Sequence, residues 1–145
     1  MKYLGIDYGT RRIGVAVSDD LGKFAFPKCI IQQGAGAQQK IINLIQEESI
    51  GEIVLGESTQ LDGTENVLMR DIRRLAMHLE EETGLQVHLQ KEWLSSVAAQ
   101  AHLYGKDVRT ENPRWTGSGN SKKRNSADDA AAAVILQRYL DRHVG

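Results

Sequence analysis

Apolar residues alternate with small or polar ones twice within the first 18 residues of the chain. Residues 2–8 and 12–18 both show this period of two, which is typical of strands. Gly9-Thr10-Arg11 between them has the length and chemistry of a hairpin turn. A third strand is expected over 24–31, after a turn at Asp20-Leu21-Gly22. The chain is therefore predicted to open with an antiparallel meander of three strands.

The pattern then changes to helical spacing, with apolar residues recurring every three or four positions. Two short apolar runs, 52–56 and 87–90, interrupt it and have the length of buried strands. Gly84 stands where the end of a helix favours a residue that tolerates positive φ. The expected helices cover residues 37–48, 62–83, 94–104 and 126–142.

A meander followed by alternating helices and strands indicates an α/β fold with a mixed sheet. Because crossovers between parallel strands are right-handed, and because the first strand must be covered on both faces, we expect that strand to be central. The predicted strand order is 3-2-1-4-5, with helices flanking the sheet. With 145 residues in all, we predict one domain over residues 1–145.

The composition bears on disulfides, zinc binding, membrane association and the distribution of charge. A single cysteine, Cys29, cannot form an intrachain disulfide, and the four histidines lack zinc-ligand spacing against it. No apolar run approaches a membrane span or a signal peptide, so we expect a cytoplasmic protein without membrane association. The net charge is −1, but residues 105–125 carry six basic and two acidic side chains, an excess of +4. This segment is predicted to be a long basic loop.

Acidic residues lie where the predicted parallel strands end. Asp7 is near the end of the central strand, and Glu57 and Glu92 follow the runs at 52–56 and 87–90. A carboxylate in a central strand is costly unless it is paired or binds a metal. Since functional groups gather beyond the carboxyl ends of such strands, the three are expected at one edge. For Asp7 the alternative is an aspartate that caps the Gly9 turn.

A further acidic candidate, Asp128, lies on the apolar stripe of the last helix. Its neighbour Asp129 has another explanation, because Ser126 followed by an acid three residues later resembles a capping box. Carboxylates without cysteine or histidine are ligands suited to Mg²⁺ or Mn²⁺. Two such ions can activate water and stabilise the leaving oxygen of a phosphodiester. The candidate chemistry is therefore two-metal hydrolysis of a nucleic acid.

Candidate nucleic-acid contacts lie on both sides of this acidic set. Lys122, Lys123 and Arg124 directly precede the helix that carries Asp128, where they would hold a phosphate backbone. Arg11 and Arg12 in the first hairpin are further phosphate contacts. Trp115, within the basic loop, could stack on an unpaired base or dock on its own domain.

The segment Gly5-Ile6-Asp7-Tyr8-Gly9-Thr10-Arg11-Arg12-Ile13-Gly14-Val15-Ala16-Val17-Ser18-Asp19 resembles the opening motif of the YqgF family. The resemblance continues at 61–65 and at 128–140. It implies an RNase H-like fold and a nuclease that matures the 5′ end of pre-16S rRNA with divalent metal ions. Cleavage of four-way DNA junctions is the alternative activity. The acidic site of the family maps onto Asp7, Glu92 and Asp128.

Three departures from the family pattern bear on activity. Lys91-Glu92-Trp93-Leu94 stands where the family usually has Asp-Glu-Arg-Leu, and Gly56-Glu57-Ser58 stands in place of Gly-Leu-Pro. The loop over 105–125 is also longer than usual. Either Glu57 serves as an additional metal ligand, or the chain is a catalytically weakened nucleic-acid-binding factor. A monomer suffices for RNA processing, whereas symmetrical junction cleavage needs a homodimer.

Overall fold

The computed structural model describes residues 1–59, 68–93 and 126–143. Within these ranges no helix is long and apolar enough to cross a membrane. The predicted helix over 94–104, the basic loop over 105–125 and the first residues of the helix predicted from 62 lie outside them. The strands are β1 (Tyr3–Tyr8), β2 (Arg12–Ser18), β3 (Ala25–Gln32), β4 (Glu52–Thr59) and β5 (Val87–Trp93). The helices are α1 (Ala37–Glu47), α2 (Met69–Thr83) and α4 (Ser126–His143).

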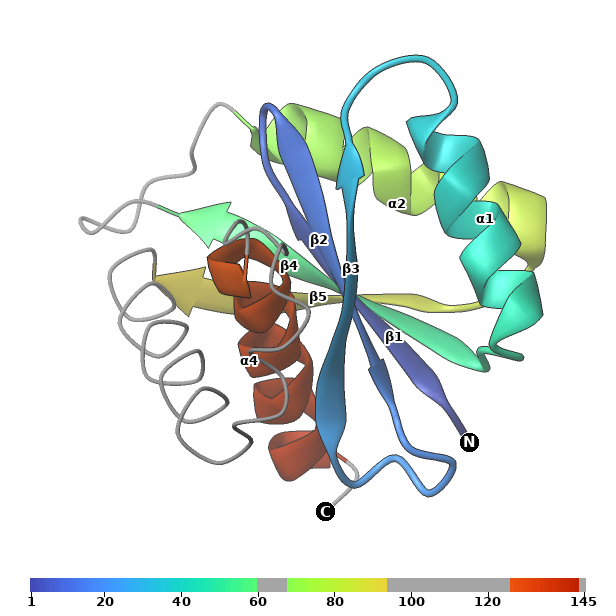
Figure 1. Cartoon of the computed structure of the whole chain (residues 1–145), viewed down its shortest axis with the longest axis vertical. Coiled ribbons are helices and arrows are strands. Elements are labelled where there is room, and N and C mark those ends of the chain that lie inside the picture. The colour runs from blue at the N-terminus through green and yellow to red at the C-terminus, as the bar shows by residue number, and fades with distance from the viewer. Residues whose placement is uncertain (60–67, 94–125, 144–145) are drawn as a thin grey trace, which may run out of the picture.

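The five strands form one sheet in the order β3-β2-β1-β4-β5, which confirms the predicted topology. β1 is central, antiparallel to β2 and parallel to β4, and β5 continues the parallel side. Figure 1 shows α4 on one face of this sheet and α1 with α2 on the other. Because the chain crosses over between parallel strands, the described helices begin near the carboxyl ends of the parallel strands.

Side-chain alternation in the strands builds a separate core on each face. In β2, Ile13 and Val15 are buried against α1 and α2, whereas Ala16 belongs to the core under α4. The first core contains mainly large aliphatic residues, and the second contains a run of alanines from Ala130 to Ala133. Small residues allow a helix to approach a sheet closely, so α4 lies nearer to the strands.

Two strand glycines show how close α4 lies. A Cβ added at Gly5 would be 2.7 Å from Leu136 Cβ and 3.2 Å from the Ala132 carbonyl oxygen. A Cβ added at Gly56 would be 2.7 Å from Ile135 Cδ1. The two 2.7 Å distances are shorter than real Cβ contacts, and at Gly5 the atoms in the way cannot rotate aside, so glycine is required there for this approach.

The carboxyl-terminal half of α4 is fixed by polar and aromatic contacts. Gln137 accepts a hydrogen bond from the Ala25 N–H through Oε1 at 2.9 Å. The Tyr139 ring stacks on His88 with centroids 5.0 Å apart and is tilted against Tyr3 at 6.1 Å. Burial, with the nearby Glu52 carboxylate, raises the pKa of the Tyr139 hydroxyl above its ordinary value. These contacts hold α4 at a fixed position along β1.

Candidate active site

Asp7 lies in the central strand, half-buried, one residue before the end of β1. It pairs with Gly14 of β2, and extending the parallel register Ile6 to Leu55 by one residue brings it level with Gly56 of β4. Since strand residues alternate between faces, Asp7 shares the face of Gly5, which is the face covered by α4. The carboxylate therefore lies on the α4 side of the sheet.

The first turn of α4 lies level with Asp7. Along β1, Tyr3 contacts Tyr139 and Gly5 meets Ala132 and Leu136, so strand and helix run in opposite directions. From Gly5 to Asp7 the strand advances about 6.6 Å, and one helical turn before Ala132 spans about 5.4 Å. That turn carries Asp128, four residues before Ala132. The packing of α4 thus brings the predicted partner of Asp7 to the same end of the sheet.

The register also gives the position of residue 92 in β5 relative to Asp7. Gly56 pairs with Gln90 and Ser58 pairs with Glu92, so Glu92 is two residues beyond the level of Asp7. Two residues along a strand restore the same face. β5 therefore brings position 92 to the same end of the sheet as Asp7, and Glu92 stays a predicted member of the acidic set.

Glu57 occupies the opposite face. It pairs with Lys91 and follows the parity of Leu55, which is buried against α1 and α2. The strands are also longer than expected, because β4 runs to Thr59 and β5 to Trp93. Glu57 is thus part of a paired strand and does not follow its end. Glu57 directly follows Gly56, and consecutive strand residues face opposite sides, so the register does not favour Glu57 as a neighbour of Asp7.

One buried polar residue of this face, Gln90, was not predicted from the sequence. Its side chain is 3% exposed, and it pairs with Gly56 at the level of Asp7. A buried amide is a costly group in a core unless it is hydrogen-bonded. Gln90 precedes the candidate Glu92 by two residues, and strand residues two apart share a face, so this spacing could have predicted it.

The turn after Asp7 is held by backbone and amide hydrogen bonds. The Gly9 N–H donates to the Arg12 carbonyl at 3.0 Å, and the Gln33 N–H donates to the Arg11 carbonyl at 2.9 Å. The Gln33 side-chain Nε2 donates to the Gly9 carbonyl at 2.7 Å. Arg11 and Arg12 are exposed on this turn, as a phosphate contact requires. The predicted contacts Trp115, Lys122, Lys123 and Arg124 lie outside the described residues.

The donor set suits a hard divalent cation. Among the side chains that the structure describes, no three histidine, cysteine, aspartate or glutamate residues lie close enough to hold a metal ion. The side chains of Glu92 and Asp128 are outside the described part of the chain. The positions of the two residues on β5 and α4, together with Asp7, would supply oxygen ligands only, which is the preference of Mg²⁺ and Mn²⁺.

A family model matches residues 1–142, and the family is RuvX, described as a Holliday junction resolvase. The chain belongs to the RuvX family. YqgF is another name for this family, so the resemblance found in the sequence is confirmed.

Curated relatives of this RuvX chain carry the name "Putative pre-16S rRNA nuclease". The one from Maridesulfovibrio salexigens is 34% identical, over 98% of this chain and 99% of its own. The one from Geobacillus kaustophilus is 37% identical, over 97% and 98%.

Two solved structures of junction resolvases share this fold. The fowlpox virus resolvase in complex with Holliday junction DNA superposes with a TM-score of 0.64 at 10% identity, and all of each chain is covered. RuvC of Thermus thermophilus, also with a Holliday junction, gives 0.59 at 15% identity, covering 100% of this chain and 96% of its own. At these identities the likeness shows the fold alone, and it confirms the RNase H-like class predicted for this RuvX chain.

Proposed function

We propose that this RuvX protein is a metal-dependent nuclease that trims the 5′ end of pre-16S rRNA. The observation that supports the proposal is that Asp7 lies on the α4 face of the sheet, at the end where β5 reaches position 92 and where α4 begins at Ser126, two residues before Asp128. The proposed acidic site would draw on three separate elements and would lie next to the exposed Arg11 and Arg12. The names of the full-length relatives support RNA as the substrate.

The chemistry follows from the charge of the site. Asp7, Glu92 and Asp128 would hold Mg²⁺ or Mn²⁺, which lowers the pKa of bound water and neutralises phosphate oxygens when present. The half-buried position of Asp7 in the central strand fixes its carboxylate, because the strand pairs on both sides. The Gln33 hydrogen bond to Gly9 keeps the following turn, and with it Arg11, next to the acids. In this proposal the chain works as one cytoplasmic domain.

A four-way DNA junction is the second candidate substrate. The fold likeness to the fowlpox virus resolvase and to RuvC, both solved with junction DNA, favours it. Symmetrical cleavage would then require two copies of the chain, one for each scissile strand. A third possibility, a factor that binds without cleaving, rests on Lys91 and Trp93, where the sequence departs from the family pattern. Lys91 is exposed and shares the face of Glu57, so it does not disturb the face of Asp7.

Cleavage of two matched substrates tests the proposed function. The protein is incubated with Mg²⁺ or Mn²⁺ and either an RNA that spans the mature 5′ end of 16S rRNA or a four-way DNA junction. We expect cleavage of the RNA at or near the mature end, and none with EDTA. Preferred cleavage of the junction would mean that the substrate is four-way DNA and that the RNA proposal is wrong. Binding of either without cleavage in both metals would contradict the nuclease proposal.

Neutralising the predicted phosphate contacts is expected to flatten the salt dependence of RNA binding. Each lost contact with single-stranded RNA lowers the slope of log K against log salt by about 0.7. Arg11→Gln should therefore lower the slope by about 0.7, and the triple change of Lys122, Lys123 and Arg124 to Gln by about 2. Binding titrations at several salt concentrations measure this.

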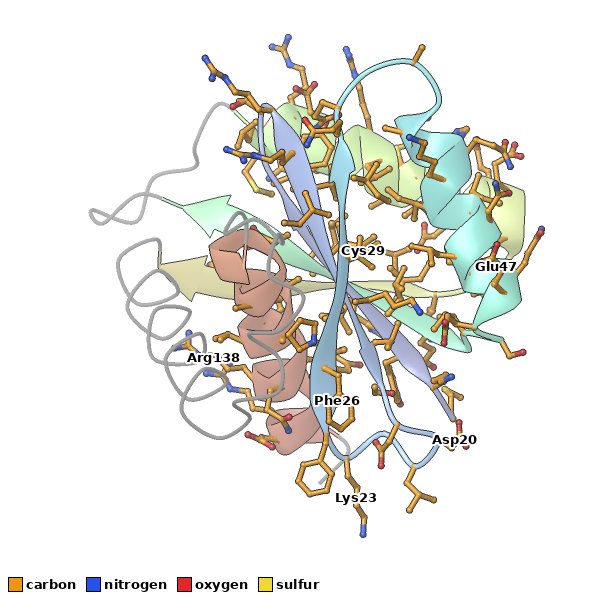
Figure 2. All side chains as sticks on the ribbon, viewed as in Figure 1. Asp20, Lys23, Phe26, Cys29, Glu47 and Arg138 are labelled. Carbon is orange, nitrogen blue, oxygen red and sulfur yellow. The ribbon has the colours of Figure 1, made fainter. Side chains whose placement is uncertain are left out.

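Lys23→Gln is the matched control for these changes. Lys23 is in the turn between β2 and β3, at the opposite end of β2 from Arg11. Figure 2 shows Lys23 close to Phe26 at this end of the sheet. The Lys23 variant should keep the slope of the unaltered protein. An equal change for Lys23 and Arg11 would mean that general charge, and no specific contact, controls binding.

A further inference from the structure

A cavity of about 410 Å³ lies on the face of the sheet that α1 and α2 cover, opposite the face of Asp7. Tyr8, which directly follows Asp7, lines it together with Ile13. The remaining wall comes from the segment Gln33–Gln39 and from Leu75 and His78 of α2. Figure 2 shows the side chains of the layer between the sheet, α1 and α2 in which this cavity lies. Its volume is within the range of roughly 300–1,000 Å³ typical of small-ligand sites.

The cavity combines an apolar floor with a polar rim. Ile13 and Leu75 are almost completely buried core residues, and Tyr8 is a half-buried aromatic ring next to them. The rim carries amide groups of glutamine side chains and the His78 imidazole, which are hydrogen-bond donors and acceptors. None of the lining residues that the structure describes is acidic. This combination fits a planar ring with polar edges better than it fits an aliphatic chain.

The loop wall of the cavity leaves room for such a ring. Gly34 and Gly36 have φ of +135° and +88°, which other residues rarely adopt. A Cβ added at either would meet nothing within 4 Å, so the space in front of this backbone is open. Ala35 between them is exposed and also lines the cavity.

The cavity wall is hydrogen-bonded to the turn that follows Asp7. Gln33 lines the cavity, and its two N–H donors bond the Gly9 and Arg11 carbonyls at 2.7 and 2.9 Å. Asp7 and Tyr8 are consecutive, so their Cα atoms are about 3.8 Å apart while their side chains lie on opposite faces. The cavity therefore lies at the same end of β1 as Asp7, on the other face of the sheet.

We propose that this cavity binds one unpaired base of the substrate strand, adjacent to the scissile phosphate. The inference rests on the proposed nuclease function and extends it, because it makes an unstacked nucleotide part of the substrate. The Tyr8 ring would contact the base, and His78 and the glutamine amides would bond its polar edges. RNA recognition commonly uses such extruded bases, since stacked bases in a helix hide their faces.

Filling the cavity tests the proposal. Ala35→Phe puts a ring into the space, and Gln46→Phe, an exposed change on α1 outside the cavity, is the matched control. A 12-nucleotide RNA is made with a single abasic site moved along it. We expect one abasic position to weaken binding to the unaltered protein and to the Gln46 variant by about tenfold. The Ala35→Phe variant should bind the intact RNA about tenfold less well and show no further loss at that position.

An NMR titration gives a direct measurement that needs no cleavage. Adenosine or uridine should shift the amide signals of Gly34–Gln38, and inorganic phosphate should not. Shifts with phosphate alone would overturn the proposal, since the loop and the start of α1 would then hold an anion. Equal abasic effects in all three proteins, or none at any position, would also overturn it. If cleavage persists in that case, the cavity proposal fails while the nuclease proposal stands.

Discussion

Replacing Asp7 by Asn is expected to lower metal-dependent cleavage by about a thousandfold or more. The change keeps the size of the side chain and one oxygen, but it removes the negative charge that would hold a divalent cation. Metal ions supply several kcal/mol of transition-state stabilisation, and about 1.4 kcal/mol corresponds to a factor of ten. Asp7 lies half-buried in the central strand at the level of the α4 start, so its loss would remove the central ligand of the proposed site. Initial rates with Mg²⁺ and Mn²⁺ measure the effect.

Glu57→Gln is the control for Asp7→Asn. It makes the same change of charge on the face that carries Leu55, away from the proposed site, so cleavage should change by about threefold at most. Glu92→Gln should behave like Asp7→Asn. Thermal unfolding of each variant separates loss of the site from loss of the fold. A larger effect for Glu57 than for Glu92 would move the second acidic ligand to the other face and contradict the assignment made from register.

The fold could be predicted from the sequence because its elements depend on periodicity. In β2 the alternation of Ile13 and Val15 with Gly14 and Ala16 has no helical interpretation, and the observed strand begins and ends at the expected residues. The left-handed conformation of Gly84, with φ of 73°, ends α2 as expected. Strand order followed from connection rules, which apply to the chain whatever its side chains.

The lengths of β4 and β5 could not be predicted in the same way. Glu57, Lys91 and Glu92 are charged, so the apolar pattern stops before them, yet backbone hydrogen bonds continue the pairing to Thr59 and Trp93. Backbone pairing needs no apolar side chain at the edge of a core. The consequence for the site is large, because the face of a strand residue depends on whether an even or odd number of residues separates it from a known one. Parity places Glu57 on the face opposite Asp7, and on the same argument Glu92 is the predicted partner of Asp7.

The closeness of α4 to β1 was also beyond prediction. The alanines of α4 and the glycine at position 5 each have ordinary explanations, as a helix former and as a strand residue. Only their contact in three dimensions shows that both are needed at one point. That contact determines where the first turn of α4 lies, and so it controls the distance between the strand acids and Asp128.

Gly5→Ala should therefore reduce both stability and cleavage. The new Cβ would be 2.7 Å from Leu136 Cβ and 3.2 Å from the Ala132 carbonyl, where ordinary contacts begin at 3.4 Å. Neither atom is the end of a flexible side chain, so α4 must move away from β1 by up to about 1 Å. Overpacking of this kind costs about 1–3 kcal/mol of unfolding free energy. A displacement of about 1 Å at a catalytic site can lower the rate by about a hundredfold.

Gly56→Ala is the matched change that separates the two effects. Its Cβ would also come within 2.7 Å of α4, but the atom it meets is Ile135 Cδ1, which a rotation of that side chain can remove. We expect a loss of about 1 kcal/mol or less and a cleavage rate within about threefold of the unaltered protein. Melting temperatures and initial rates below the melting range measure both. Equal losses of cleavage in the two variants would show that the position of α4 over Gly5 does not control the site.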